Sequence, residues 1–168
     1  MRKLFYLLFV SVFAFSFIGC DDKDDDNEWR DLNIAAYNKI VSNSEYSHVT
    51  VPEGPTGTYR KIINKGNGTE YPINTSKVKV YYKGYLYDGT VFDNGTSITE
   101  RPAEFELGGS SVVRGFSVAI QNMVVGDKWE IVIPYHLGYG TSKYGSIPGY
   151  TTLFFEVELL EIDRYPHL

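Results

Sequence analysis

Apolar residues follow three different patterns along the chain, and each pattern predicts a different kind of structure. Residues 4–17 form an unbroken run of apolar and small residues. Residues 27–42 carry apolar side chains at steps of three and four, which predicts a short amphipathic helix. From residue 59 onward the period changes to two, which predicts β-strands. The expected strands are 59–64, 77–87, 91–93, 105–107, 129–133 and 153–159.

One segment inside the strand region has helical spacing instead. Phe116, Ile120 and Met123 lie three or four residues apart, and Ser110 and Ser111 precede them as candidate helix caps. The pattern therefore predicts an α+β fold. Its sheet is antiparallel, has about five strands and is wrapped around one short helix, and an N-terminal helix extends it. A pocket is expected on the helix side of this sheet.

Turn-forming residues divide the chain into segments. Ser, Pro and Gly gather between residues 42 and 57 without periodicity, which predicts a linker. Asp88-Gly89 predicts a hairpin turn between two strands. The expected segments are a signal peptide at 1–19, an acidic tether at 20–26, a helix and linker at 27–57 and a folded domain at 58–168.

The N-terminus has the layout of a secretory signal. Arg2 and Lys3 precede the apolar run, which is shorter than the roughly 20 residues that a membrane-spanning helix needs. The run ends at Ile18-Gly19-Cys20, which resembles the lipobox of bacterial lipoproteins. This resemblance predicts that Cys20 is lipidated and that the protein is anchored in the cell envelope, at the outer membrane, facing the periplasm or the cell surface. An uncleaved anchor with an incidental cysteine is the alternative.

The charge of the chain disfavours nucleic acid as a partner. The sequence has 16 basic and 21 acidic residues, a net charge of −5. Without residues 1–19, which contain Arg2 and Lys3, the difference becomes 14 minus 21, or −7. Residues 21–26 include five aspartates and no apolar side chain, so we expect a solvated tether there. A signal for display on the cell surface is a second interpretation of this acidic run.

The sequence predicts neither a metal site nor a cofactor. His48, His136 and His167 are scattered without the spacing of metal ligands. The chain also has no phosphate-binding glycine motif, and the acidic run lacks the glycine and distal glutamate of a calcium loop.

Nine short stretches of the strand region resemble the FKBP family of peptidyl-prolyl cis/trans isomerases, in the same order and at matching separations. Together they extend over residues 58–163, most of the chain that follows the signal. The stretches are 80–84, 88–93, 105–108, 112–116, 126–127, 133–134, 138–140, 147–148 and 153–159.

The resemblance implies an aromatic pocket that rotates the peptide bond before proline, with proline-containing polypeptides as partners and no cofactor. The catalytic positions that it implies are Tyr82, Phe92, Asp93, Tyr139 and Phe155. The substrate-binding positions that it implies are Phe105, Val112, Val113, Phe116 and Ile147. Because the reaction transfers no proton, Asp93 is interpreted as an organiser of the site and not as a general acid.

The residues expected at the rim of the pocket differ from the family pattern. Ala103 and Ser111 replace an aromatic residue and a glutamate, and the loop after Asp93 is longer; Tyr144 and Tyr150 are candidates to rebuild the rim. Two functions therefore stay open. The first is an isomerase that assists the folding of exported proteins, and the second is a non-catalytic chaperone that binds peptides in the same pocket. A purely structural lipoprotein is a third.

Overall fold

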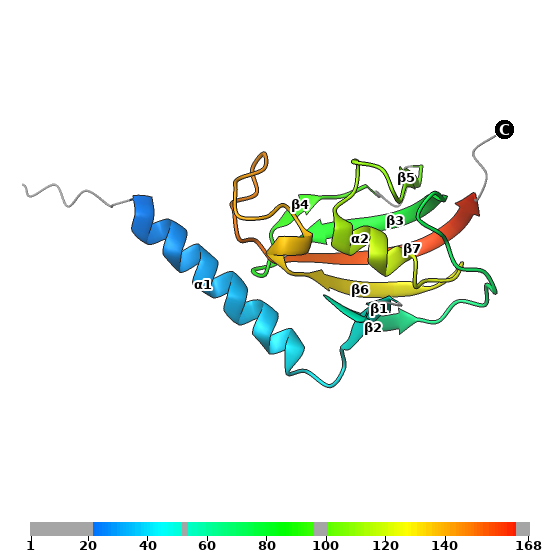
Figure 1. Ribbon diagram of the computed structural model, residues 1–168, viewed down its shortest axis with the longest axis horizontal. Coiled ribbons are helices and arrows are strands. Elements are labelled where there is room, and N and C mark those ends of the chain that lie inside the picture. Colours follow the sequence, from blue (N-terminus) through cyan, green and yellow to red (C-terminus); the bar gives the residue numbers. More distant parts are fainter. Residues whose placement is uncertain (1–21, 52–53, 96–100, 164–168) are drawn as a thin grey trace, which may run out of the picture.

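The computed structural model describes residues 22–51, 54–95 and 101–163, which form an α+β fold (Figure 1). Within these residues the sheet has seven strands, where about five were expected. The elements are α1 (Asp22–Val41), β1 (Ser47–Val51), β2 (Gly54–Asn64), β3 (Lys77–Tyr85), β4 (Val91–Asp93), β5 (Ala103–Glu106), α2 (Arg114–Ile120), β6 (Lys128–Ile133), a 3-10 turn (Tyr135–Leu137) and β7 (Leu153–Asp163). The predicted fold class with its N-terminal helix is confirmed.

Strand β3 is the central element of the sheet. The strands follow the order β1-β2-β6-β7-β3-β4, with β5 also paired to β3, and every pair is antiparallel. The predicted hairpin between β3 and β4 is confirmed: Leu86 N donates to Thr90 O at 2.8 Å, and Gly89 takes the positive φ of 86° that glycine tolerates. This hairpin returns Asp93 to a position opposite Gly84.

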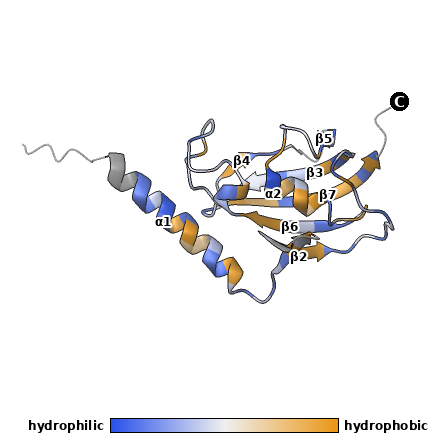
Figure 2. Ribbon diagram, viewed as in Figure 1, coloured by the Kyte–Doolittle hydropathy of each residue, from blue (hydrophilic) through white to orange (hydrophobic). Residues whose placement is uncertain are grey.

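The inner face of the sheet forms the main core against α2. Val78 and Val80 of β3 are buried, as their alternation predicted, and Figure 2 shows the hydrophobic residues concentrated in β6 and β7. Phe116 and Ile120 of α2 are buried in the same cluster. Removal of this apolar surface from water is the main favourable term in the folding of the domain.

Helix α2 is shorter than predicted, and the prediction that Ser110 and Ser111 cap it was wrong. The helix begins at Arg114, with Val113 at the N-cap and no side-chain cap hydrogen bond. Packing holds it in place instead: a Cβ atom at Gly115 would lie 2.4 Å from Cγ2 of Ile133. A helix of seven residues is marginal by itself, so tertiary contacts decide where it starts and ends.

The outer face of the sheet has a second, smaller core that α1 covers. Tyr59, Val132 and Phe154 are buried there, and Tyr37 and Ile40 of α1 pack against them. The hydroxyl of Tyr37 donates to Gly57 O at 2.5 Å. Helix α1 thus packs on its own domain, while its N-terminal end extends beyond the sheet (Figure 1).

Two boundaries in the N-terminal region differ from the predictions. Helix α1 begins at Asp22 and not at residue 27, so the described part of the expected acidic tether is helical. The linker prediction was wrong for Ser47–Val51, which form β1, and for residues 54–57, which begin β2. In β1 only Val49 and Val51 are apolar, so the alternation is too short to predict a strand from the sequence.

The predicted signal peptide, residues 1–19, and the predicted lipidation site, Cys20, lie outside the described residues. Among the helices that are described, none is both long and apolar enough to cross a membrane.

Candidate active site

A small pocket of about 50 Å³ lies between α2 and the inner face of the sheet. Strands β3, β5 and β7, the end of β4, the start of α2 and the loop after the 3-10 turn each contribute to its walls. Its lining residues are Tyr82, Asp93, Phe105, Ser111, Val112, Val113, Phe116, Tyr139 and Phe155. The structure thus brings together eight of the ten positions that the family resemblance implied, and it adds Ser111.

The walls of the pocket are aromatic rings packed edge to face. Phe116 lies at the centre with 3% of its surface exposed, and its ring centroid is 5.2 Å from that of Phe155 and 5.8 Å from that of Phe105. The ring of Tyr82 closes the group at 5.5 Å from Phe105. Edge-to-face pairs of this kind add specific attraction to the burial of apolar surface. The pocket therefore has rigid, apolar walls.

Phe92 and Ile147, the other two implied positions, do not line the pocket. The ring of Phe92 packs edge-on against Phe155 at 5.5 Å, and Ile147 is buried in the main core. Phe92 therefore supports the wall residue Phe155, whereas Ile147 is part of the core. A sequence pattern cannot separate a wall residue from the residue that backs it, because both are apolar.

One polar pair lies at the edge of the aromatic pocket. The hydroxyl of Tyr82 donates to Oδ2 of Asp93 at 2.8 Å. Burial, followed by this hydrogen bond, raises the pKa of the Tyr82 phenol above its usual value. Burial and the neighbouring Tyr144 and Asp93 likewise raise the pKa of Tyr139. Both phenols stay protonated at neutral pH; Tyr82 donates its hydrogen to Asp93, whereas Tyr139 keeps its own for another acceptor.

Two donors at the pocket have no acceptor within the described part of the chain. They are the backbone N–H of Val113 and the hydroxyl of Tyr139. The ring of Tyr139 is held in place by Tyr144, which stacks on it with centroids 4.3 Å apart and planes 6° apart. Tyr144 is 62% exposed and does not itself line the pocket, and Tyr150 packs against Tyr135. The pocket thus combines apolar walls with free donors at its edge.

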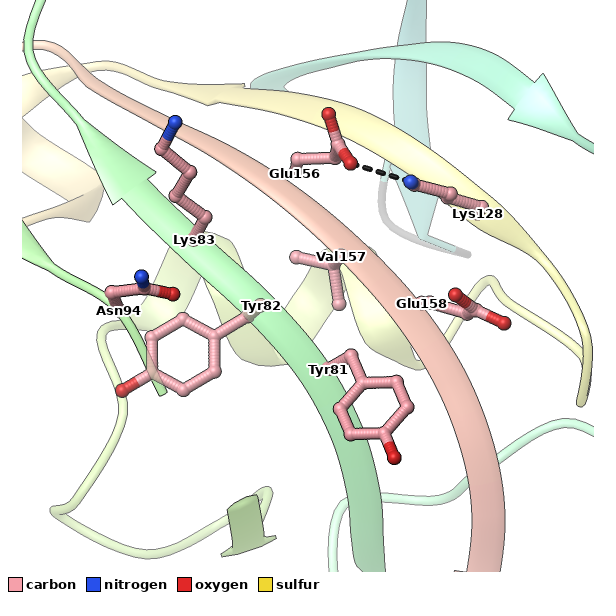
Figure 3. A pocket seen from close by; sticks show the side chains of 8 residues that line it. All are labelled: Tyr81, Tyr82, Lys83, Asn94, Lys128, Glu156, Val157 and Glu158. Carbon is pink, nitrogen blue, oxygen red and sulfur yellow. Dashed lines mark ion pairs between the residues drawn. The ribbon is translucent and has the colours of Figure 1, made fainter. Parts of the chain in front are cut away.

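A larger hollow of about 420 Å³ lies along β3, β7 and β6 and shares only Tyr82 with this pocket (Figure 3). Four of its eight lining residues are charged: Lys83, Glu158 and the ion pair of Lys128 with Glu156 at 2.5 Å. A proline ring gains most from contact with buried apolar rings, and Phe116 and Phe155 line the small pocket and not this hollow. The aromatic pocket is therefore the better candidate for a proline site in spite of its smaller volume.

Among the described residues, which include His48 and His136, no three potential metal-ligating side chains gather. His48 instead shares a hydrogen bond of 2.8 Å with the hydroxyl of Tyr59.

Fold, pocket and sequence agree on one class of protein. The family model of the FKBP-type peptidyl-prolyl cis-trans isomerases matches residues 68–160, which are 93 of the 168 residues. The chain belongs to this family, and the resemblance seen in the sequence is confirmed.

Several known proteins are similar to this chain. The FKBP-type 22 kDa peptidyl-prolyl cis-trans isomerase of Escherichia coli is 48% identical over 108 residues, which are 64% of this chain and 50% of that protein. The outer membrane protein MIP of Legionella longbeachae is 38% identical, over 66% of this chain and 46% of its own length. The chain spans about half the length of these curated relatives.

Solved structures show the same architecture. The crystal structure of FkpA from Escherichia coli superposes with a TM-score of 0.72 and 31% identity, covering 86% of this chain and 63% of FkpA. A peptidyl-prolyl cis-trans isomerase from Pseudomonas syringae gives a TM-score of 0.69 with 29% identity, and the match covers 82% of this chain and 95% of that one.

Proposed function

We propose that the protein is a peptidyl-prolyl cis/trans isomerase that assists the folding of exported proteins. The observation that carries this proposal is the aromatic pocket around Phe116, with Asp93 and Tyr139 at its edge, in a chain of the FKBP family. Proline-containing polypeptides are the proposed partners. The catalytic roles of Tyr82, Phe92, Asp93, Tyr139 and Phe155 and the binding roles of the other implied residues stay predictions.

The proposed mechanism needs no nucleophile, metal or proton transfer. Rotation about the bond before proline is slow because the amide must lose its resonance, with a barrier of about 18–20 kcal/mol. The twisted amide has a less polar carbonyl than the planar ground state, so a pocket that excludes water favours the twisted form. The rings of Phe116 and Phe155 supply such surroundings.

The donors at the edge of the pocket have a complementary role in this mechanism. The N–H of Val113 and the phenol of Tyr139 would hold the carbonyl groups of the substrate, and Asp93 would order Tyr82 through their hydrogen bond. A reduction of the barrier by about 5 kcal/mol corresponds to an acceleration between a thousandfold and ten-thousandfold, since about 1.4 kcal/mol gives a factor of ten. Desolvation and orientation are sufficient for an effect of this size without a charged catalyst.

Exchange NMR on a short prolyl peptide tests this function. The wild-type full chain, purified in mild detergent, is expected to accelerate cis/trans exchange well above the uncatalysed rate. Tyr139→Ala removes a pocket wall and a donor, so kcat/KM is expected to fall by about tenfold or more.

Tyr71→Ala is the matched control, because Tyr71 is exposed and does not line the pocket. Its rate is expected to equal that of the wild type. A wild-type rate no faster than the uncatalysed reaction contradicts the isomerase function. Peptide binding that persists in the same sample without acceleration favours the chaperone function instead.

We also propose that the protein is a lipoprotein of the bacterial cell envelope, anchored through Cys20 at the outer membrane on its periplasmic or outer surface. Three observations support this location: the signal layout of residues 1–19, the lipobox-like end at Cys20 and the name outer membrane protein that the Legionella relative carries. Two acyl chains give stable anchoring where a single chain is marginal.

Fractionation of cells that express the full chain tests the anchor. Cys20→Ala is expected to move the protein out of the membrane pellet, because no acyl chain can then be attached. Ser16→Ala, a change within the same N-terminal run, is the control and is expected to stay in the pellet. A Cys20→Ala protein that sediments with the membranes like the wild type contradicts lipidation.

A further inference from the structure

Helix α1 lies outside the residues that the family model matches, yet it contacts the segment that joins the rim of the pocket to β7. We infer that Asn33 of α1 is a positioning residue, which holds the loop of residues 138–152 and through it the pocket walls Tyr139 and Phe155. The effect on catalysis rests on the proposed isomerase function. The effect on the loop can be measured independently of it.

Asn33 is the centre of a small set of hydrogen bonds. The residue is 0% exposed, and its Nδ2 donates to Trp29 O, one helical turn earlier, at 2.9 Å. Its Oδ1 accepts from the backbone N–H of Thr152 at 2.9 Å, and its backbone oxygen accepts from the Thr152 hydroxyl at 3.1 Å. Buried amide groups need partners, and here the partners fix how α1 lies against Thr152.

Trp29 makes a second contact beside the first. Its Nε1 donates to Oγ1 of Thr151 at 3.1 Å, and the hydroxyl of Thr151 donates in turn to Pro148 O at 2.7 Å. The ring of Trp29 also packs edge-on against Tyr87, with centroids 5.4 Å apart. We call Trp29 and Asn33, with their partners Thr151 and Thr152, the α1 clasp.

The α1 clasp is linked to the pocket in two directions. Toward the rim, Ile147 precedes Pro148 and exchanges two backbone hydrogen bonds of 2.9 Å with Tyr144, the residue that stacks on Tyr139. Toward the sheet, Thr152 leads directly into β7, which carries Phe155. Close-packed structure transmits small displacements, so a loosened clasp is expected to loosen both walls.

Hydrogen exchange on the full chain in mild detergent tests the α1 clasp. Asn33→Ala removes the side-chain acceptor for Thr152, so exchange of the backbone amides of residues 138–152 is expected to rise by about tenfold, while β3 and β6 keep their protection. The kcat/KM for the prolyl peptide is expected to fall by about threefold to tenfold, measured at a temperature where the variant is folded.

Asn38→Ala is the matched control, since Asn38 is an exposed asparagine on the same helix. It is expected to leave exchange and kcat/KM within about twofold of the wild type. Trp29→Phe is a milder second variant that keeps a ring beside Tyr87 and loses only the donor to Thr151. It is expected to raise exchange near residues 148–152 by about threefold.

Two results overturn the inference. One is a folded Asn33→Ala protein whose loop exchange and kcat/KM both match the wild type, and the other is a uniform rise in exchange over the whole sheet, which shows a general loss of stability. If Asn33→Ala does not fold, Trp29→Phe tests the inference in its place. Unchanged exchange at residues 148–152 in Trp29→Phe then contradicts the α1 clasp. A wild type without isomerase activity contradicts only the proposed function, because the exchange data judge the clasp by themselves.

Discussion

Replacement of Phe116 by leucine is expected to lower kcat/KM for prolyl isomerisation by about tenfold or more, which corresponds to about 1.4 kcal/mol of transition-state stabilisation. Phe116 touches the rings of Phe105, Phe155 and Tyr82, so a smaller, non-planar side chain removes the centre of the aromatic cluster. Exchange NMR of the prolyl peptide measures the change. Phe116→Ala, which leaves a larger void, is expected to cost about 3–5 kcal/mol in the free energy of unfolding.

Phe154→Leu is the control for this prediction. Phe154 is also a buried phenylalanine of the sheet, but it belongs to the outer cluster and stacks on Tyr85. A similar loss of stability of about 1 kcal/mol is expected from both leucine variants, measured by urea unfolding, with the large loss of kcat/KM confined to Phe116→Leu. Equal kcat/KM values in the two variants would mean that the pocket around Phe116 is not the catalytic site.

Gly84→Ala is expected to displace Phe155, another residue that lines the same pocket. A Cβ atom at Gly84 would lie 2.7 Å from Cζ of Phe92 and 2.8 Å from Cε1 of Phe155, too close for either ring to keep its place. Overpacking of a core in this way costs about 1–3 kcal/mol in the free energy of unfolding. Since Phe155 lines the pocket, kcat/KM is expected to fall by about tenfold together with the melting temperature.

Gly89→Ala is the control for Gly84→Ala, because it is expected to lower stability without lowering kcat/KM. Gly89 has a positive φ of 86°, and a Cβ atom there would have no neighbour within 4 Å, so alanine strains the hairpin turn without touching the pocket. A loss of stability of about 1 kcal/mol with unchanged kcat/KM is expected, from thermal unfolding and exchange NMR. If Gly84→Ala keeps wild-type kcat/KM, Phe155 is not a functional wall of the pocket.

Much of the fold could be predicted because its signals are local. Alternation along residues 77–87 correctly assigns Val78 and Val80 to the core, and Asp88-Gly89 correctly marks the hairpin that returns Asp93 to the site. The errors occur where local signals are weak or absent. Strand β1 buries only Val49, and α2 starts without a capping serine because packing fixes its ends.

The candidate site was predictable only through the family resemblance. Composition and spacing place Phe105, Phe116 and Phe155 on the inner face of an element, but they cannot show that these rings meet. Nor can they show that Phe92 and Ile147 do not line the pocket, since an apolar residue gives the same pattern in either position. The stacking of Tyr144 on Tyr139 had no sequence signal beyond a tyrosine in the right loop.

The sequence by itself thus determined the fold class, the family and most of the residues of the pocket, because hydrophobic period, turn chemistry and spaced motifs are properties of neighbouring residues. Only the tertiary structure decided which of those residues form the wall, and that α1 belongs to the domain. The contact between Asn33 and Thr152 joins positions 119 residues apart, and no local pattern records a hydrogen bond over that separation. The residues that line the pocket could therefore be named from short motifs, whereas the contacts that hold them in place exist only in the folded chain.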